Sequence, residues 1–182
     1  DYGFCGESVS RRNVTSEISY MKYEIGKFMD KEKETIIGKV IATCTSEIKG
    51  VQKKNVHQVC LIEDYGIEGD AHAGKWHRQV SLLSYDKIQE FRAKGAEIED
   101  GAFGENLVVE GFDFAKLPVG TKFRCNDVVL EMTQIGKKCH HGCAIFQKMG
   151  DCIMPREGVF TRVLHGGVIH EGDELVIIEE NE

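Results

Sequence analysis

The densest cluster of reactive side chains in the sequence is Lys137-Lys138-Cys139-His140-His141-Gly142-Cys143. It follows a predicted strand and precedes a short predicted helix, which puts Cys139 close to a helix N-terminus. The lysines, the imidazoles and the positive helix end all favour a thiolate over a thiol. A thiolate can act as a sulfur nucleophile, a persulfide carrier or a soft-metal ligand. The alternative is a solvent-facing loop cysteine without a task.

The other cysteines have less definite roles. Cys143 is either a resolving thiol for a transient bond with Cys139 or the first apolar residue of the following helix, and plain packing is slightly favoured. Cys152 is open in the same way. Three further cysteines fall in predicted strands, where an unpaired cysteine behaves as a small hydrophobe, so we expect them in the core: Cys44, Cys60 and Cys125.

A zinc site has to be weighed, because His140 and His141 stand among these cysteines. Structural zinc sites commonly use two Cys-x2-Cys pairs. Here the first spacing is Cys-x3-Cys, and eight residues separate Cys143 from Cys152. The spacing therefore argues against zinc, and the Cys-x3-Cys-x2-Cys signature of a radical iron–sulfur cluster is absent as well.

A second group of candidate residues lies in the glycine-rich segment from Gly66 to Ser81. Its glycines would let a ligand approach the backbone, and Arg78 offers a planar fork for a phosphate or carboxylate. The segment is not a P-loop, because no Gly-Lys-Ser/Thr ending is present. A structural alternative pairs Asp70 with Arg78 to hold the segment, and both roles can coexist.

Two further places carry polar residues with open roles. Glu105 and Asn106 lie where a loop enters a strand, and either contact a ligand or brace the glycine-rich segment. Arg156 and Arg162 flank the entry into another strand. They are available for an anion or, alternatively, form surface salt bridges.

The elements that position these residues are mostly strands. A helix is predicted over residues 84–94, capped by Ser84, with Ile88 and Phe91 facing the core and Gly95 ending it. A second helix, over 144–149, should close at Gly150. Runs rich in β-branched residues predict strands at 37–44, 56–62, 106–109, 122–125, 128–132, 159–164 and 174–178.

Two glycine-containing turns, within 118–123 and 170–175, each deliver the chain into a strand. Such corners are common where a sheet curls round on itself. About seven short strands with two inserted helices, and no regular βαβ alternation, favour a mainly β fold: a closed or nearly closed β-barrel, not a doubly wound sheet.

Bulk properties limit the classes of function. The 182 residues fit one domain with an appendage. Lys and Arg total 23 against 30 Asp and Glu, a net charge of −7, which argues against nucleic-acid binding but leaves room for a local basic pocket. Seven cysteines without framework spacing favour reduced thiols in the cytoplasm. No apolar run nears the roughly 18 residues that span a bilayer and no signal-peptide pattern appears, although the start at Asp1 leaves a removed leader open.

Residues 1–35 differ from the remainder, 36–182. They form an N-terminal extension or linker in which apolar residues recur at helical spacing: Ile18, Met21, Ile25, Phe28 and Met29. We expect a helix that packs on the barrel or on a partner subunit. A piece of a preceding domain is the alternative.

Taken together and in order, the glycine-rich segment, the Glu105 region and the Cys139 region resemble the MOSC family, named for the C-terminal domain of molybdenum cofactor sulfurases. The resemblance spans about residues 36–179. The matching stretches are Gly69-Asp70, His77-Arg78-Gln79-Val80-Ser81, Gly104-Glu105-Asn106-Leu107, Cys139, Gly158-Val159-Phe160-Thr161-Arg162-Val163, Gly166-Gly167 and Gly172-Asp173.

The resemblance implies a β-barrel like that of pyruvate kinase and an association with a molybdopterin-type cofactor. Some relatives pass sulfur to the metal through a cysteine persulfide, and others bind molybdenum through that cysteine and reduce N-hydroxylated compounds. Cys139 aligns with this cysteine, as a catalytic residue or molybdenum ligand. The candidate cofactor contacts are Asp70, His77, Arg78, Gln79, Ser81, Glu105, Asn106 and Arg162.

The sequence departs from better-characterised relatives in having Lys138 where a proline often precedes the cysteine. It contains no pyridoxal-dependent desulfurase portion and no flavin or iron–sulfur motif, so sulfur or electrons would come from another protein. The favoured function is cofactor sulfuration, storage or delivery to molybdenum enzymes. The alternatives are a molybdenum-dependent reductase of N-hydroxylated compounds and a non-catalytic binding module, with or without zinc. The oligomeric state stays open.

Overall fold

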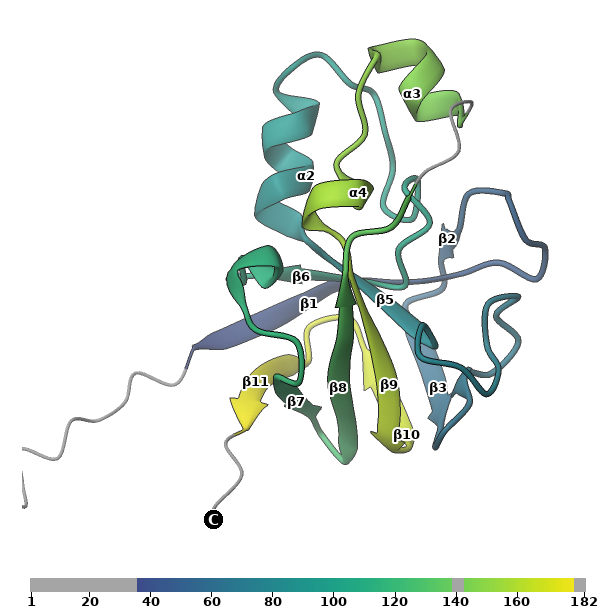
Figure 1. Ribbon diagram of the computed structural model, residues 1–182, viewed down its shortest axis with the longest axis vertical. Coiled ribbons are helices and arrows are strands. Elements are labelled where there is room, and N and C mark those ends of the chain that lie inside the picture. The colour runs from purple at the N-terminus through teal and green to yellow at the C-terminus, as the bar shows by residue number, and fades with distance from the viewer. Residues whose placement is uncertain (1–35, 139–142, 179–182) are drawn as a thin grey trace, which may run out of the picture. The chain divides into compact units, whose positions relative to one another are not determined.

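The computed structural model describes residues 36–138 and 143–178, and strands predominate in both ranges (Figure 1). The helix expected within residues 1–35 lies outside the described residues, as does Cys139. The helices are α2 (Tyr85–Arg92), α3 (Ala144–Met149) and α4 (Met154–Glu157), with a 3-10 turn η1 (Phe114–Lys116). The strands are β1 (Ile37–Thr45), β2 (Lys54–Asn55), β3 (Gln58–Ile62), β4 (Gly66–Ile67), β5 (Val80–Ser84), β6 (Leu107–Glu110), β7 (Lys122–Cys125), β8 (Val128–Ile135), β9 (Val159–His165), β10 (Gly167–His170) and β11 (Glu174–Ile178).

Seven strands form a closed barrel, which confirms the expected fold class. Their order is β11-β7-β8-β9-β5-β6-β1, and β11 pairs with β1 to close the ring. The pairings along this ring are antiparallel except β5 with β6, which run parallel. Parallel neighbours need a crossover, and α2 supplies it. Strands β10, β3 and β4 form a separate three-stranded sheet.

The sequence did not predict β5, which we read as part of the loop before α2. All five of its residues are buried, so the strand lacks the alternation that marks a half-exposed strand. Leu82 packs in the barrel interior, while its neighbour Leu83 packs in a second apolar cluster on the other face. A strand that is covered on both faces gives no period of two in the sequence.

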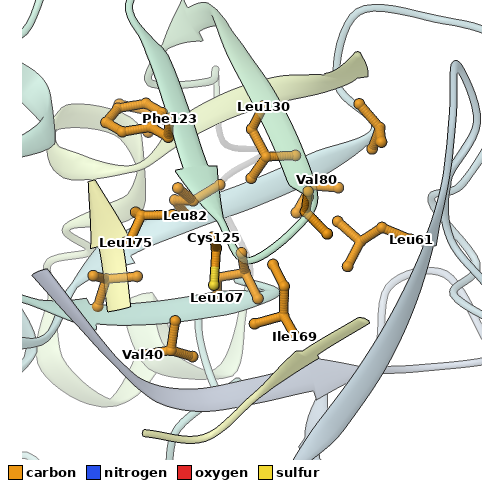
Figure 2. Close-up of a cluster of buried hydrophobic side chains, with 14 of the residues drawn as sticks. Val40, Leu61, Val80, Leu82, Leu107, Phe123, Cys125, Leu130, Ile169 and Leu175 are labelled. Atoms are coloured by element: carbon orange, nitrogen blue, oxygen red, sulfur yellow. The ribbon is translucent and has the colours of Figure 1, made fainter. Parts of the chain in front are cut away.

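The hydrophobic core has two parts. Figure 2 shows the barrel interior, where side chains from several strands meet, among them Val40, Leu107 and Phe123. The second cluster lies between the barrel wall and the helices and includes Ala42, from the same strand as Val40. A register shift between Val40 and Ala42 explains how two residues of equal parity reach opposite faces of β1.

Other predicted details agree with the structure. Helix α3 covers the expected residues and ends at Gly150, whose φ is +70°. Helix α2 ends at Arg92, two residues early, but Ile88 and Phe91 are buried as expected. Ser84 occupies the N-cap of α2 without a side-chain capping bond. Within the described ranges, no helix is long and apolar enough to cross a membrane.

Both predicted glycine corners are tight turns. Thr121 N–H donates to Pro118 O at 3.1 Å, and Asp173 N–H donates to His170 O at 3.2 Å. The turns lead into β7 and β11, which pair with each other in the barrel. Both turns therefore lead the chain into barrel strands, as the sequence predicts.

Candidate functional site

A cavity of about 760 Å³ lies where four connecting segments meet, a volume typical of small-molecule sites. The segments join β1 to β2, β4 to β5, α2 to β6, and β8 to α3. The lining includes Lys53, His72, Trp76, Arg78, Ser81, Asn106, Lys137, Lys138, Cys143 and Phe160. Residues that are distant in the sequence thus converge on one space.

Arg78 is the most informative side chain in this cavity. Its guanidinium carbon lies 4.8 Å from the ring centroid of Trp76 and 5.6 Å from that of Phe160, within range for cation–π contact. Its Nε is buried and has no hydrogen-bond partner among the residues described. Burying an N–H donor of a charged group without a hydrogen-bond acceptor costs folding free energy. The geometry therefore suits an anionic ligand that supplies the acceptor.

Gln79 fixes the backbone next to Arg78. This residue is fully buried, and its Oε1 accepts the N–H of Val163 at 2.8 Å. Its backbone N–H donates to Thr161 O at 3.0 Å, so the residue clamps the start of β5 onto β9. Gln79 does not line the cavity. Gln79 therefore supports the backbone that carries Arg78 and does not contact the cavity itself.

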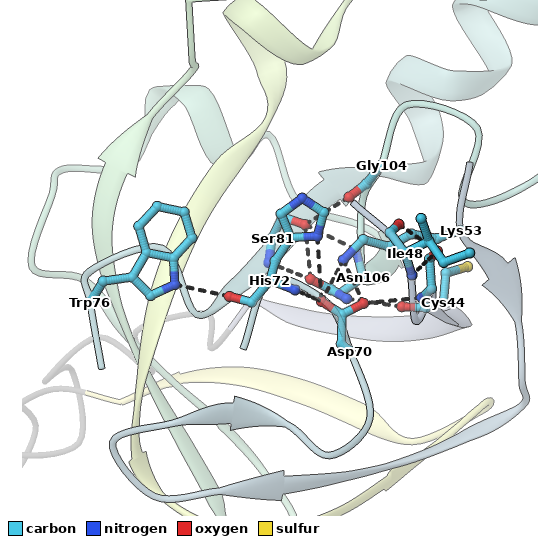
Figure 3. A network of polar contacts seen from close by, with 10 residues as sticks. Cys44, Ile48, Lys53, Asp70, His72, Trp76, Ser81, Gly104 and Asn106 are labelled. Atoms are coloured by element: carbon cyan, nitrogen blue, oxygen red, sulfur yellow. Dashed lines mark hydrogen bonds and ion pairs between the residues drawn. The ribbon is translucent and has the colours of Figure 1, made fainter. Parts of the chain in front are cut away.

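Asp70 forms a buried ion pair with Lys53 (Figure 3). Both carboxylate oxygens lie 2.9 Å from the Lys53 ammonium, and the backbone N–H groups of Ser46 and His72 also donate to them. Burial opposes ionisation of Asp70, but His72, the Lys53 ammonium and the Ser46 N–H together hold its pKa well below the usual range. The alternative pairing of Asp70 with Arg78 is wrong, because the ion-pair partners of Asp70 in the described structure are Lys53 and His72.

Glu105 braces the loop before β6. It is fully buried, and its two oxygens accept the N–H groups of Gly101, at 2.7 Å, and Phe103, at 3.0 Å. Burial raises the pKa of Glu105 to about 7, although these hydrogen bonds partly oppose the rise. Phe103 lines the cavity, whereas Glu105 does not. Glu105 therefore holds a part of the cavity wall.

Ser81 and Asn106 form a polar ladder at the cavity wall. The side chain of Asn106 accepts the N–H and hydroxyl of Ser81, at 3.1 and 3.0 Å, and donates to Cys44 O at 2.9 Å. Ser81 Oγ also contacts Gly104 O at 3.2 Å. These bonds join β5 and β1 to the residue that precedes β6, at the wall of the cavity that Arg78 also lines.

His77 and Arg162 lie elsewhere. They line a second hollow, of about 530 Å³, which shares Trp76 with the first cavity. His77 Nε2 lies 2.9 Å from Gln134 Oε1, and Arg162 lies 3.3 Å from Glu131. The structure therefore groups Arg78, Ser81 and Asn106 in one cavity and separates His77 and Arg162 from them. Their role as cofactor contacts stays a prediction.

The cysteines divide by environment. Cys44 and Cys125 are buried as expected, and burial raises the pKa of both thiols, that of Cys125 to about 12. Cys60 is exposed, contrary to expectation, because β3 turns Val59 and Leu61 inward instead. Cys152 is buried in the second core cluster.

Cys143 is exposed and lines the cavity, so the packing interpretation of this residue is wrong. It occupies the N-cap of α3, where its sulfur accepts the Phe146 N–H at 3.4 Å. Lys137 and Lys138 line the same cavity. In the described parts of the chain, no three His, Cys, Asp or Glu side chains are grouped to hold a metal ion.

Sequence reasoning missed Lys53, His72 and Phe160 as parts of this site. Lys53 sits in a polar run that reads as exposed loop, and its partner is 17 residues away. Phe160 reads as a core strand residue. Only His72 carried a local signal, since it lies in the glycine-rich segment already singled out.

Comparison with known proteins places this geometry in a family. The model of the MOSC domain matches residues 69–176, more than half of the chain. The sequence matches none of the curated proteins compared. Because the family model covers the glycine-rich segment from Gly69, the Glu105 loop and the strands around the cavity, it spans most of the site.

Solved structures share the fold at low sequence identity. The YuaD protein from Bacillus subtilis has a TM-score of 0.68 at 20% identity, over 79% of this chain and 97% of that one. YiiM from Geobacillus stearothermophilus has a TM-score of 0.62 at 20% identity, over 78% and 75%. YiiM from Escherichia coli has a TM-score of 0.53 at 19% identity, over 81% and 71%. The chain belongs to the MOSC domain family, whose members are generally related to the molybdenum cofactor.

Proposed function

We propose that this chain binds a molybdenum cofactor in the cavity at Arg78 and supports its sulfuration or delivery, with Cys139 as the sulfur-carrying residue. The observation that carries the proposal is the buried Nε of Arg78, which lacks a partner within the described structure although the guanidinium lies against two aromatic rings. A ligand with an oxyanion would supply the acceptor.

The residues present fit such a cofactor. A molybdopterin combines a fused ring system with a phosphate, and the cavity offers the aromatic side chains of Trp76 and Phe160 beside a cationic wall. Arg78 would bind the phosphate by charge-assisted hydrogen bonds, with Lys137 and Lys138 adding positive charge. When bound, the group supplies redox chemistry and a site that accepts sulfur. The protein's own part is to bind, orient and shield it.

The sequence position of Cys139 supports its assignment. It directly follows Lys138, and Cys143 resumes the described chain; both of these flanking residues line the cavity. In this proposal a separate cysteine desulfurase would donate the sulfur, and a molybdenum enzyme would receive the product. Reduced cysteines are compatible with a cytoplasmic reaction.

The test is persulfide mapping. The full chain is incubated with a cysteine desulfurase and cysteine, and persulfides are located by mass spectrometry. Cys139→Ser should abolish the modification, whereas Cys60→Ser, at an exposed cysteine outside the cavity, should leave it unchanged. Persulfide spread evenly over exposed cysteines would overturn the assignment.

A second assay separates the alternative function. Reduction of a hydroxylaminopurine by a reducing dye, lost in Cys139→Ser, together with no persulfide, would make the protein a molybdenum-dependent reductase. Stoichiometric zinc with neither activity would make it a binding module.

A further inference from the structure

We propose that His72 is a proton-transfer residue of the cavity and that the buried carboxylate of Asp70 fixes its tautomer. The inference rests on the proposed function for the identity of the ligand, but the arrangement of His72 and Asp70 exists without any ligand.

His72 has one buried side and one open side. Its side chain lines the cavity and is 37% exposed, whereas its Nδ1 is buried and makes no hydrogen bond within the described residues. Asp70 Oδ2 faces this nitrogen at 3.7 Å (Figure 3). The exposure therefore belongs to the remainder of the ring, on the side away from Asp70.

The carboxylate of Asp70 cannot turn away from His72. Two contacts of 2.9 Å bind it to Lys53, and two backbone N–H groups donate to its oxygens. A fixed anion beside Nδ1 favours the proton on that nitrogen and leaves Nε2 as the proton-accepting atom. At 3.7 Å the contact is longer than a hydrogen bond, as such contacts often are before a ligand binds.

The backbone of His72 is held as firmly as its partner. Its N–H donates to Asp70 Oδ2 at 3.1 Å, and its carbonyl oxygen accepts the indole N–H of Trp76 at 2.9 Å. Trp76 in turn lies against Arg78. The imidazole and the anion-binding guanidinium are thus mounted on one braced segment, which keeps both aligned with a single ligand.

The charges around His72 come from several elements. Asp70, paired with Lys53, faces it from the buried side, while Arg78, Lys137 and Lys138 contribute cations to the cavity wall. An anion held by these cations would therefore lie in the same cavity as the imidazole.

In its protonated form, His72 can serve the proposed sulfur transfer as the proton donor. An acceptor thiolate attacks the terminal sulfur of the donor persulfide, so that a new S–S bond forms as the donor S–S bond breaks. The departing donor thiolate takes the proton from Nε2, which leaves neutral His72, and water restores the proton. Sulfur, charge and protons balance, and no external oxidant or reductant is needed.

The first test is nitrogen NMR of the imidazoles in the ligand-free full chain, with His72→Gln identifying the signals. We expect His72 as the Nδ1–H tautomer in the wild type and a shift to Nε2–H in Asp70→Asn, whose amide can donate toward Nδ1. His57 is the internal control, since its Nδ1 contacts a different acid, Glu171, at 2.6 Å. If Asp70→Asn fails to fold, Lys53→Met/Asp70→Asn removes both charges of the pair together.

The second test is the rate of persulfide transfer. His72→Ala should slow it by about 100-fold, the lower end for loss of a general acid, and added imidazole should restore part of the rate. A wild-type Nε2–H tautomer, or a tautomer indifferent to Asp70→Asn, would overturn the inference. Absence of rescue in a folded His72→Ala protein would do the same. A correct tautomer in a protein that binds no cofactor would refute the proposed function and leave the pairing of His72 with Asp70 intact.

Discussion

The buried pair of Lys53 and Asp70 makes a quantitative prediction about stability. Lys53→Met leaves the Asp70 carboxylate buried without a counter-ion, since the two side chains are 1% and 0% exposed. Removing one partner of a buried pair costs roughly 3–5 kcal/mol. The backbone N–H groups of Ser46 and His72 still bind the carboxylate, so we expect the lower end, about 3 kcal/mol.

Urea unfolding at neutral pH measures this loss. Lys53→Met/Asp70→Asn should be more stable than Lys53→Met, because it leaves no unpaired charge. Lys87→Met is the matched control: it breaks a surface pair with Glu90 at 3.3 Å and should change the unfolding free energy very little. The prediction is refuted if Lys53→Met lowers the unfolding free energy by less than about 1 kcal/mol, or if the losses caused by Lys53→Met and Asp70→Asn simply add in the double variant.

Three further predictions concern pH, backbone geometry and thiol reactivity. Because burial raises the pKa of Glu105 from 4.5 to about 7, the folded state binds the extra proton between these values, and stability should fall by about 3 kcal/mol as pH rises through that window. In urea unfolding at a series of pH values, Glu105→Gln should flatten the dependence of the unfolding free energy on pH. Parallel pH profiles of the variant and the wild type would refute this prediction. In the same assay, Gly136→Ala should lower the unfolding free energy more than Gly150→Ala. The φ angles of the two glycines are similar, +67° and +70°, but of the two only Gly136 would bring an added Cβ against backbone, with Pro155 O at 2.0 Å. Equal losses of unfolding free energy would show that the surrounding backbone shifts to relieve this contact. Limiting iodoacetamide at neutral pH should label Cys139 before the other six cysteines in peptide mapping, and preferential labelling elsewhere would count against the thiolate.

The sequence predicted the fold well where local signals were strong. Helix α3, with Gly150 at its end, needs only short-range information. Strand β5 was not predicted, because both of its faces are buried and its sequence does not alternate. Cys60 was wrongly expected in the core, because nothing in the local sequence distinguishes a strand of the barrel from a strand of the three-stranded sheet.

The candidate site was predicted only in part, for two physical reasons. His77 and Arg78 are neighbours in the sequence, but they line different cavities, and adjacency in an irregular segment does not show which way each side chain points. Arg162 alternates with the buried Thr161 on β9 and points to Glu131 instead. The contact between Lys53 and Asp70 depends on loop closure, which residue spacing does not reveal.

The most direct test of cofactor binding is the molybdenum and pterin content of the full chain purified from a molybdenum-replete host. We expect both in the wild type and in Arg124→Ala, which removes an exposed arginine on β7. Arg78→Ala should bind more weakly by about 1.5–3 kcal/mol, the loss of a charge-assisted hydrogen bond, and retain correspondingly less of each. Wild-type protein without molybdenum or pterin, or an Arg78→Ala protein that retains as much as the wild type, would contradict the account.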